Sequence, residues 1–203
     1  NCVISSETFE VLACPPENDN CATATIAVVN DEAACALLTP GTILAATPSG
    51  VDAGTCAGNP DDDVWFQFTA LNEVQIISIL NITGGTNNLD HALYEGSCGA
   101  LVELACTNGT SSVTPGLTVG NTYFIRVFSG GGSLETSSFD LCIREAPSNL
   151  ICENAENFCA DDGGALVSSN IIGIPSSGQI ACLFTAPNPT WNILQIGDPG
   201  LIE

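Results

Sequence analysis

The sequence predicts an all-β protein, an antiparallel β-sandwich or jelly roll stapled by disulfide bonds. Helical periodicity is nearly absent, whereas short alternating apolar runs bounded by Gly, Pro, Asn, Ser and Thr recur along the 203 residues. Hydrophobic residues make up 45% of the chain, which is enough for a sizeable core. Eleven cysteines at uneven spacings indicate an oxidising, extracellular compartment.

Four segments have the clearest strand character, residues 64–69, 74–80, 121–128 and 138–143. In the first, Val64, Phe66 and Phe68 share one face, so this aromatic face should be buried. The third segment has apolar residues on both faces, which indicates a central strand covered on each side. Segments of Gly, Ser, Thr and Asn lie between strands and are expected to be the loops of a meander or Greek key. These loops are 83–88, 107–112 and 129–133.

The chain divides into four parts by composition. Residues 1–16 read as a strand ended by two prolines, either the last strand of a preceding module or a clasp onto the next one. Residues 17–145 are expected to form one self-contained β module, followed by a linker at 146–151. Residues 152–203 read as an incomplete second β module. An incomplete sandwich has an open edge, which its own chain or a strand from another chain would complete.

The charge of the chain restricts its partners. Against 23 acidic residues stand only Arg126 and Arg144, which gives a formal net charge of −21. Such a surface repels phosphate backbones and anionic lipids, so nucleic acid is excluded as a partner. No apolar run reaches the ~18 residues needed to span a bilayer, so no membrane insertion is expected. A surface with this negative charge is compatible with the binding of divalent cations.

The cysteines are expected to be structural. The expected pairs are Cys98 with Cys106 across a short turn, Cys35 with Cys56 across a loop, Cys21 with Cys142 at the two ends of the module, and Cys159 with Cys182 in the second segment. No partners are assigned to Cys2, Cys14 and Cys152. A bridge between Cys2 and Cys14 would leave Cys152 as the odd thiol of the eleven.

Catalytic motifs are scarce, and the chain is not expected to be an enzyme. The only histidine, His91, follows Asp90, but adjacent residues of a strand point to opposite faces. No G-x-S-x-G or H-E-x-x-H motif is present. Four aromatic residues could form a platform for sugar stacking, although their apolar neighbours favour core packing. They are Trp65, Tyr94, Tyr123 and Trp191.

Five motifs occur in a fixed order: ENDNCATAT at 17–25, DDDVWFQFTA at 61–70, ALYEGSCGALVELAC at 92–106, GNTYFIRVFS at 120–129 and FDLCI at 139–143. Together they resemble the bacterial pre-peptidase C-terminal domain, in the version repeated in secreted surface proteins of Bacteroidetes. Two later motifs are similar to the first half of a second Bacteroidetes surface module. They are CENAENFC at 152–159 and CLFTAPNPTWNILQIGDPG at 182–200. The resemblance implies a jelly-roll-like sandwich, export by a route such as type IX secretion, and an accessory or adhesive role.

A calcium site is the main candidate for chemistry. Clustered carboxylates with an Asn carbonyl at a strand entrance can supply the six to eight hard oxygen ligands that calcium prefers. Related collagen-binding domains of bacterial collagenases carry a similar acidic pattern, and the resemblance points to Glu17, Asn18, Asp19, Asp61 and Asp63 as ligands. The alternative is that these residues form an Asx-turn and a solvated turn.

The leading interpretation is a non-catalytic structural or adhesive module of a long exported cell-surface protein, stiffened by calcium. Its expected partners are neighbouring modules or identical subunits, with surface glycans or proteins as ligands. One alternative is an accessory carbohydrate- or protein-binding module of a secreted hydrolase, which an exposed aromatic row would favour. The other is a subunit of an extracellular filament, in which the strand at 3–12 completes a neighbour's sandwich.

Overall fold

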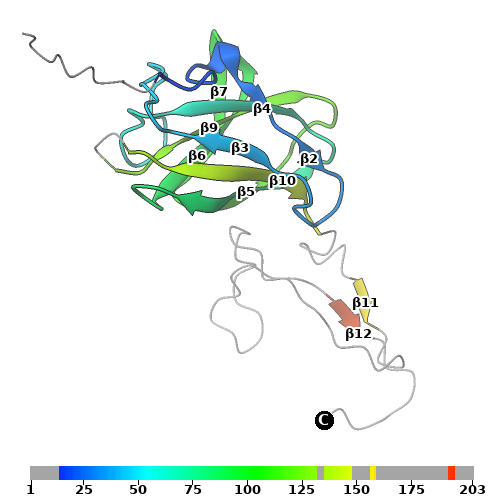
Figure 1. Cartoon of the computed structure of the whole chain (residues 1–203). Coiled ribbons are helices and arrows are strands. Elements are labelled where there is room, and N and C mark those ends of the chain that lie inside the picture. The colour runs from blue at the N-terminus through cyan, green and yellow to red at the C-terminus, as the bar shows by residue number, and fades with distance from the viewer. Residues whose placement is uncertain (1–13, 132–134, 148–155, 159–191, 195–203) are drawn as a thin grey trace, which may run out of the picture.

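The computed structural model describes residues 14–131, 135–147, 156–158 and 192–194, and Figure 1 shows two stacked β-sheets. Within this part of the chain the only helical element is the short 3-10 helix η1 (Cys21–Thr23), and all other regular structure is β. The expected all-β sandwich is therefore confirmed. Two further strands, β11 (Glu156–Phe158) and β12 (Asn192–Leu194), pair in parallel in a separate small sheet. The division into domains stays a prediction.

Both large sheets are mixed. The first, called sheet A here, has the order β1-β4-β9-β6-β7, and the second, sheet B, has the order β2-β10-β5-β8 with β3 also paired to β10. Sheet A comprises β1 (Thr25–Ile26), β4 (Val64–Thr69), β6 (Leu89–Ser97), β7 (Ala100–Thr107) and β9 (Thr122–Ser129). Sheet B comprises β2 (Val29–Asn30), β3 (Thr39–Thr42), β5 (Val74–Thr83), β8 (Ser111–Pro115) and β10 (Ser138–Glu145).

Strand β10 has two partners on one edge. Its first half pairs antiparallel with β3, and its last residues pair in parallel with β2. Because β1 pairs with β4 of sheet A, the segment carrying β1 and β2 passes from one sheet to the other and closes that side of the sandwich. The edge of sheet A at β7 and the edge of sheet B at β8 lie at the other end of the strand orders.

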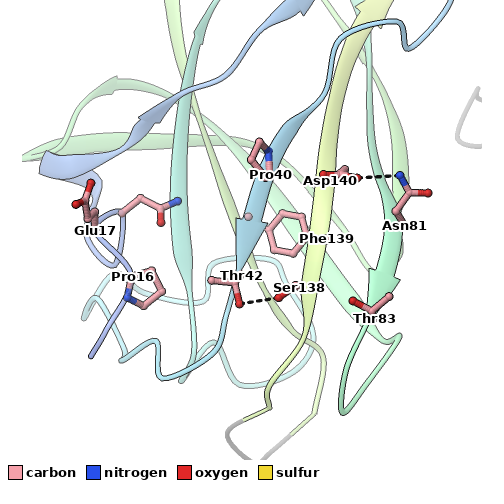
Figure 2. Close-up of a pocket in the computed structure, with 11 residues that line it drawn as sticks. Pro16, Glu17, Pro40, Thr42, Asn81, Thr83, Ser138, Phe139 and Asp140 are labelled. Atoms are coloured by element: carbon pink, nitrogen blue, oxygen red, sulfur yellow. Dashed lines mark hydrogen bonds between the residues drawn. The ribbon is translucent and has the colours of Figure 1, made fainter. Parts of the chain in front are cut away.

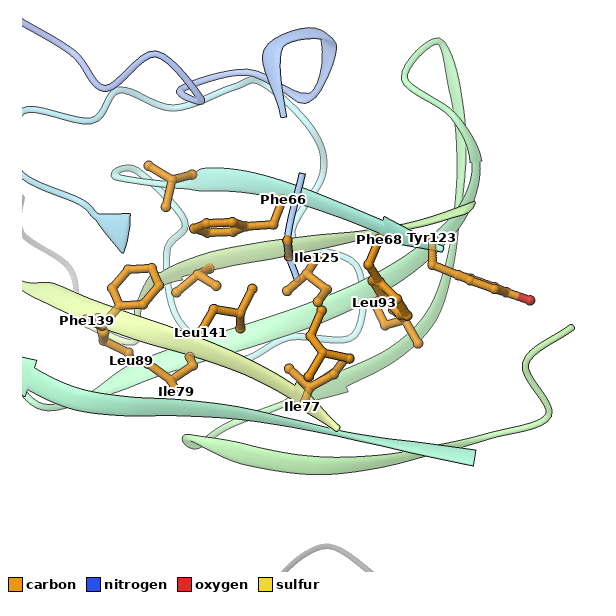
Figure 3. Packing of buried hydrophobic residues seen from close by; sticks show 14 of the residues in the cluster. Phe66, Phe68, Ile77, Ile79, Leu89, Leu93, Tyr123, Ile125, Phe139 and Leu141 are labelled. Carbon is orange, nitrogen blue, oxygen red and sulfur yellow. The ribbon is translucent and has the colours of Figure 1, made fainter. Parts of the chain in front are cut away.

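The core lies between the two sheets, as Figure 3 shows for its central residues. Phe66 and Phe68 of β4 face Leu141 of β10 across the interior, and all three are at most 1% exposed. This confirms the buried aromatic face predicted for residues 64–69. Strand β9 is buried on both faces from Tyr123 to Ser129, as predicted for a central strand.

A long loop, residues 47–63, covers the outer face of sheet A. Trp65, Tyr94 and Phe124 are buried there, and Val51 of the loop packs against them. The preference for core packing of Trp65, Tyr94 and Tyr123 is therefore confirmed, whereas Trp191 lies outside the described residues. No aromatic side chain among residues 14–131 and 135–147 is exposed.

The four predicted strands correspond to β4, β5, β9 and β10, with ends that differ by a few residues. The loop predicted at 107–112 is wrong at both ends, since Thr107 ends β7 and Ser111 begins β8. Small polar residues are accepted there because each has a cross-strand partner, Thr107 opposite His91 and Ser111 opposite Ser78. At Thr107 and Ser111, pairing with a neighbouring strand therefore outweighs the local preference of small polar residues for a turn.

Six cysteines of the sandwich form disulfides, but all three predicted pairings are wrong. The bonds are Cys21–Cys98, Cys35–Cys142 and Cys56–Cys106, with Cα–Cα distances of 5.5, 5.8 and 5.3 Å. Cys98 lies at the tip of the β6–β7 hairpin and Cys106 lies eight residues further along β7, roughly 27 Å away at 3.4 Å per residue. Such a separation far exceeds the reach of a disulfide.

The second wrong pair, Cys35 with Cys56, is separated by the whole sandwich. Cys35 lies against sheet B through its bond to Cys142 of β10, whereas Cys56 lies over sheet A through its bond to Cys106 of β7. Cys21 is in η1, which packs on sheet A beside the hairpin tip, so it meets Cys98. Cys14 is exposed and unpaired in the described chain. The pair Cys159–Cys182 and the fates of Cys2 and Cys152 lie outside the described residues.

Candidate functional site

A polar groove of about 570 Å³ lies over the ends of three neighbouring strands, β3, β10 and β5. Its polar residues follow from strand alternation. On β10, Phe139 and Leu141 face the core, so Ser138 and Asp140 face outward. The register places Thr42 of β3 and Thr83 of β5 on either side of Ser138, which gives a row of three hydroxyls across three strands.

A second row lies beside the first (Figure 2). Pro40 of β3 is opposite Asp140, and an irregularity in the β5–β10 pairing brings Asn81 to the other side of Asp140. Asn81 has a φ of 52°, in the left-handed region that Asn tolerates better than most residues. Its Nδ2 donates to Asp140 Oδ2 at 2.8 Å. Residues Pro16 and Glu17 form a further wall of the groove.

The position of β3 depends on a glycine. A Cβ on Gly41 would lie 2.6 Å from Cζ of Phe139 and 2.7 Å from Cζ of Phe66. The two rings therefore pack directly against the backbone of β3, with their centroids 5.9 Å apart. This contact holds the strand that carries Thr42 and Pro40 against the core, so the groove is built on rigid elements.

Four of the five predicted calcium ligands hydrogen-bond to other parts of the protein. Asp19 accepts hydrogen bonds from Thr47 N at 2.7 Å and Thr47 Oγ1 at 2.6 Å, and so holds the loop over sheet A. Asn18 Nδ2 donates to the Trp65 carbonyl at 2.9 Å, and Glu17 lines the groove. Among the described residues, no group of three or more His, Cys, Asp or Glu side chains is placed to hold a metal ion.

The other two predicted ligands also have protein partners. Asp61 Oδ2 accepts from Asn59 Nδ2 at 3.1 Å. Asp63 is fully buried and accepts from Arg126 Nε at 2.7 Å and Trp65 Nε1 at 3.0 Å. The calcium site stays a prediction, and its alternative of a solvated turn is wrong for Asp63, which is buried and paired with Arg126.

A serine–histidine pair lies inside the sandwich. His91 Nε2 is 2.7 Å from Ser112 Oγ, and His91 Nδ1 is 2.9 Å from the Gly109 carbonyl. The carbonyl requires a proton on Nδ1, so Ser112 donates to Nε2. Burial lowers the pKa of His91 from 6.5 to about 4, although the Gly109 hydrogen bond opposes this shift. Asp90 pairs with Phe128 and points to the opposite face of β6, as predicted, so it does not complete a triad.

The pair connects the two sheets. His91 is 1% exposed and Ser112 is 7% exposed, and His91 belongs to β6 of sheet A while Ser112 belongs to β8 of sheet B. A serine so enclosed is out of reach of a substrate, and a histidine with such a pKa is a weak base. The buried hydrogen bond between His91 and Ser112 therefore supports a structural role, which is to join the two sheets.

Sequence reasoning missed the groove residues Thr42, Asn81, Thr83, Ser138 and Asp140. The only signal was the alternation of polar and apolar residues in SFDLCI, in which Ser138 and Asp140 fall on the face opposite the core. The neighbours of this strand could not be read from the sequence, because β3 and β5 reach it from about 100 and 60 residues away.

The chain was compared with known proteins. A family model described as galactose-binding domain-like, for domains associated with type IX secretion, matches residues 17–141. The match contains β3, β5 and the part of β10 that lines the groove. A comparison with curated proteins finds no match.

Proposed function

Because the chain belongs to the galactose-binding-domain-like family associated with type IX secretion, we propose that it is a non-catalytic adhesive module of an exported bacterial surface protein. Domains of this kind are usually binding modules. Within the described residues, no helix combines the length and the apolar character needed to cross a bilayer. The narrower likeness to the pre-peptidase C-terminal domain covers nearly the same stretch and stays a prediction.

The groove on sheet B is the observation that carries this proposal. Its side chains come from three hydrogen-bonded strands whose inner faces pack in the core, so their positions are fixed before any ligand arrives. Its volume of about 570 Å³ falls in the range of sites for small ligands or single side chains. Hydroxyl, amide and carboxylate groups without a buried nucleophile and base suit recognition better than catalysis.

The accessory carbohydrate-binding alternative lacks the feature that would favour it. A sugar-stacking platform needs exposed aromatic rings, and every aromatic side chain of residues 14–131 and 135–147 is buried. The groove offers prolines and polar groups instead. The role of a protein-binding module therefore agrees better with this surface.

Assembly by strand exchange is supported by one observation, the outer edge of β7. This strand pairs only with β6, and no backbone hydrogen bond reaches its other edge from the described residues. It presents Val102 at 54% and Leu104 at 44% exposure and contains no lysine or proline to discourage pairing. The disulfide of Cys106 holds the edge in place. Mixing the chain with a peptide of residues 3–12 tests this candidate, since strand addition would protect the amides of β7 from exchange.

Filling the groove tests the leading proposal. Thr83→Tyr places a ring in the groove, and Thr122→Tyr makes the same change at an exposed position of β9 outside it. Beads coated with the chain should adhere to surfaces bearing proteins or polysaccharides of the extracellular environment. Thr83→Tyr should lose most of this adhesion and Thr122→Tyr should keep it. Equal adhesion of both variants would contradict binding through the groove.

A further inference from the structure

The hydrogen-bond directions around the groove show which ligand it can satisfy. Ser138 Oγ donates to Thr42 Oγ1 at 3.1 Å, and Thr42 Oγ1 donates to the Ser137 carbonyl at 3.1 Å. Asn81 uses one amide N–H on Asp140. The hydroxyl hydrogens of Ser138 and Thr42 therefore point at other protein atoms, while Asp140 Oδ1 and a lone pair of Ser138 stay available as acceptors.

The carboxylates increase this excess of acceptors. Asp140 Oδ1 has no hydrogen bond in the described chain, and the Glu17 carboxylate has neither a hydrogen bond nor an ion pair there. No cation lines the groove. A sugar hydroxyl both donates and accepts, and the few donors left for it include the Thr83 hydroxyl and the second N–H of Asn81. A guanidinium offers five donors and no acceptor, which matches the lining.

We propose that the groove binds an arginine side chain of an extended basic peptide segment of a partner protein. The planar guanidinium would lie against Asp140 Oδ1 and the lone pair of Ser138, with Glu17 at the entrance. Its three methylenes would pack on the rings of Pro16 and Pro40, the apolar walls of the groove. The proposal rests on the proposed adhesive function and names its ligand.

The charge of the whole chain supports a basic partner. Its formal charge is −21, and of its two arginines Arg126 is 1% exposed while Arg144 is held by the Ala33 carbonyl. The surface therefore attracts cationic segments over a distance of about 8 Å at physiological salt. Attraction of this kind is general, so a test must separate it from binding in the groove.

The test uses a short acetylated peptide with two arginines separated by glycine, and the same peptide with citrulline, the neutral isostere of arginine. Calorimetry with the full 203-residue chain compares Asp140→Asn and Glu17→Gln with Asp31→Asn. Asp31 is exposed and outside the groove, so its variant removes the same charge without touching the site. Asparagine at 140 can still accept from Asn81, so the local structure should persist.

The arginine peptide should bind, and the citrulline peptide should not. Asp140→Asn should weaken binding about tenfold, because it removes a charge-assisted hydrogen bond. Glu17→Gln should act in the same direction, and Asp31→Asn should change the affinity by less than about twofold. Equal losses in Asp31→Asn and Asp140→Asn would overturn the proposal in favour of a general field. Equal affinity for the citrulline peptide would overturn it as well.

The groove-filling variant distinguishes this inference from the proposed function. If Thr83→Tyr abolishes bead adhesion while the arginine peptide never binds, the groove is the adhesive site and only its ligand class is wrong. If an oligosaccharide binds the unaltered chain and fails to bind Asp140→Asn, the ligand is a polyol. If Thr83→Tyr adheres normally, the adhesive role of the groove fails together with the inference.

Discussion

Replacing Arg126 with methionine should strongly destabilise the sandwich. Arg126 is 1% exposed and its Nε donates to the fully buried Asp63 at 2.7 Å. Its Nη1 and Nη2 donate to the carbonyls of Asp52 and Val51, each at 3.0 Å. The guanidinium also lies 5.5 Å from the centroid of the Trp65 ring. One side chain thus joins strand β9 to the loop that covers sheet A.

The magnitude follows from what the substitution leaves behind. Methionine fills much of the same volume, so the lost packing is small. Asp63 keeps its hydrogen bonds from Trp65 and Ser49 but loses its only counter-charge, and two loop carbonyls lose their donors. Breaking a buried ion pair from one side typically costs about 3–5 kcal/mol. We expect the free energy of unfolding to fall by about that amount.

Urea unfolding of the oxidised protein, followed by near-UV circular dichroism of Trp65, measures this loss. Asp63→Asn should also destabilise the protein. The double variant Arg126→Met, Asp63→Asn should lose clearly less than the sum of the two, because neither charge is left alone. A loss below about 1 kcal/mol for Arg126→Met, or strict additivity in the double variant, would refute the view that the pair anchors the loop.

Four further outcomes are expected. Burial lowers the pKa of His91 to about 4, so below about pH 6.5 the unfolded chain binds a proton that the folded chain does not. Stability from His91 should be fully present above pH 6.5 and fall by up to about 3 kcal/mol toward pH 4, and His91→Gln should flatten this part of the pH profile in urea melts. Cys35→Ala with Cys142→Ala opens a bridge spanning 107 residues and should cost about 4–5 kcal/mol in the same assay. Gly41→Ala should cost about 1–3 kcal/mol in thermal unfolding, because its Cβ would overlap the ring of Phe139. Adding calcium should leave the melting temperature nearly unchanged. A rise of many degrees that a chelator reverses would instead support the predicted calcium site.

The sequence was informative where the alternation of residues within a single strand shows which of its faces is buried. Residues 64–69 alternate between the core and the outer face, and β4 has these same bounds. Strands β6 and β7 gave no such signal, because small and polar residues occupy positions that their partners tolerate. Their outer faces pack against disulfides and a loop from elsewhere in the chain, and the periodicity of β6 and β7 does not reveal this packing.

The cysteine pairing failed for a related reason. Two pairs were assigned to cysteines near one another in sequence and the third to the two ends of the module, yet the three bonds span 50 to 107 residues and join other partners. Each joins a covering segment to a strand or hairpin of the sheet beneath it, and such contacts depend on which loop lies over which sheet. The acidic residues show the same dependence. Asp19 and Asp63 read as calcium ligands, but both hold the loop at 47–63 by hydrogen bonds to Thr47 and Ser49.

These covering contacts explain why the groove is where it is. Arg126 and the bond of Cys56 to Cys106 hold residues 47–63 over sheet A, and the bond of Cys35 to Cys142 holds another segment over the far end of β10. No segment of the described chain covers the near end of β10 in this way, and there the outward residues are polar, with Ser138 and Asp140 at the centre of the groove. A sandwich that buries tryptophan and arginine on one outer face and leaves a hydroxyl row open on the other has separate surfaces for stability and for recognition. Substitutions of the outward polar residues of the groove should therefore change binding with little effect on folding, whereas those under the covering loops should do the reverse.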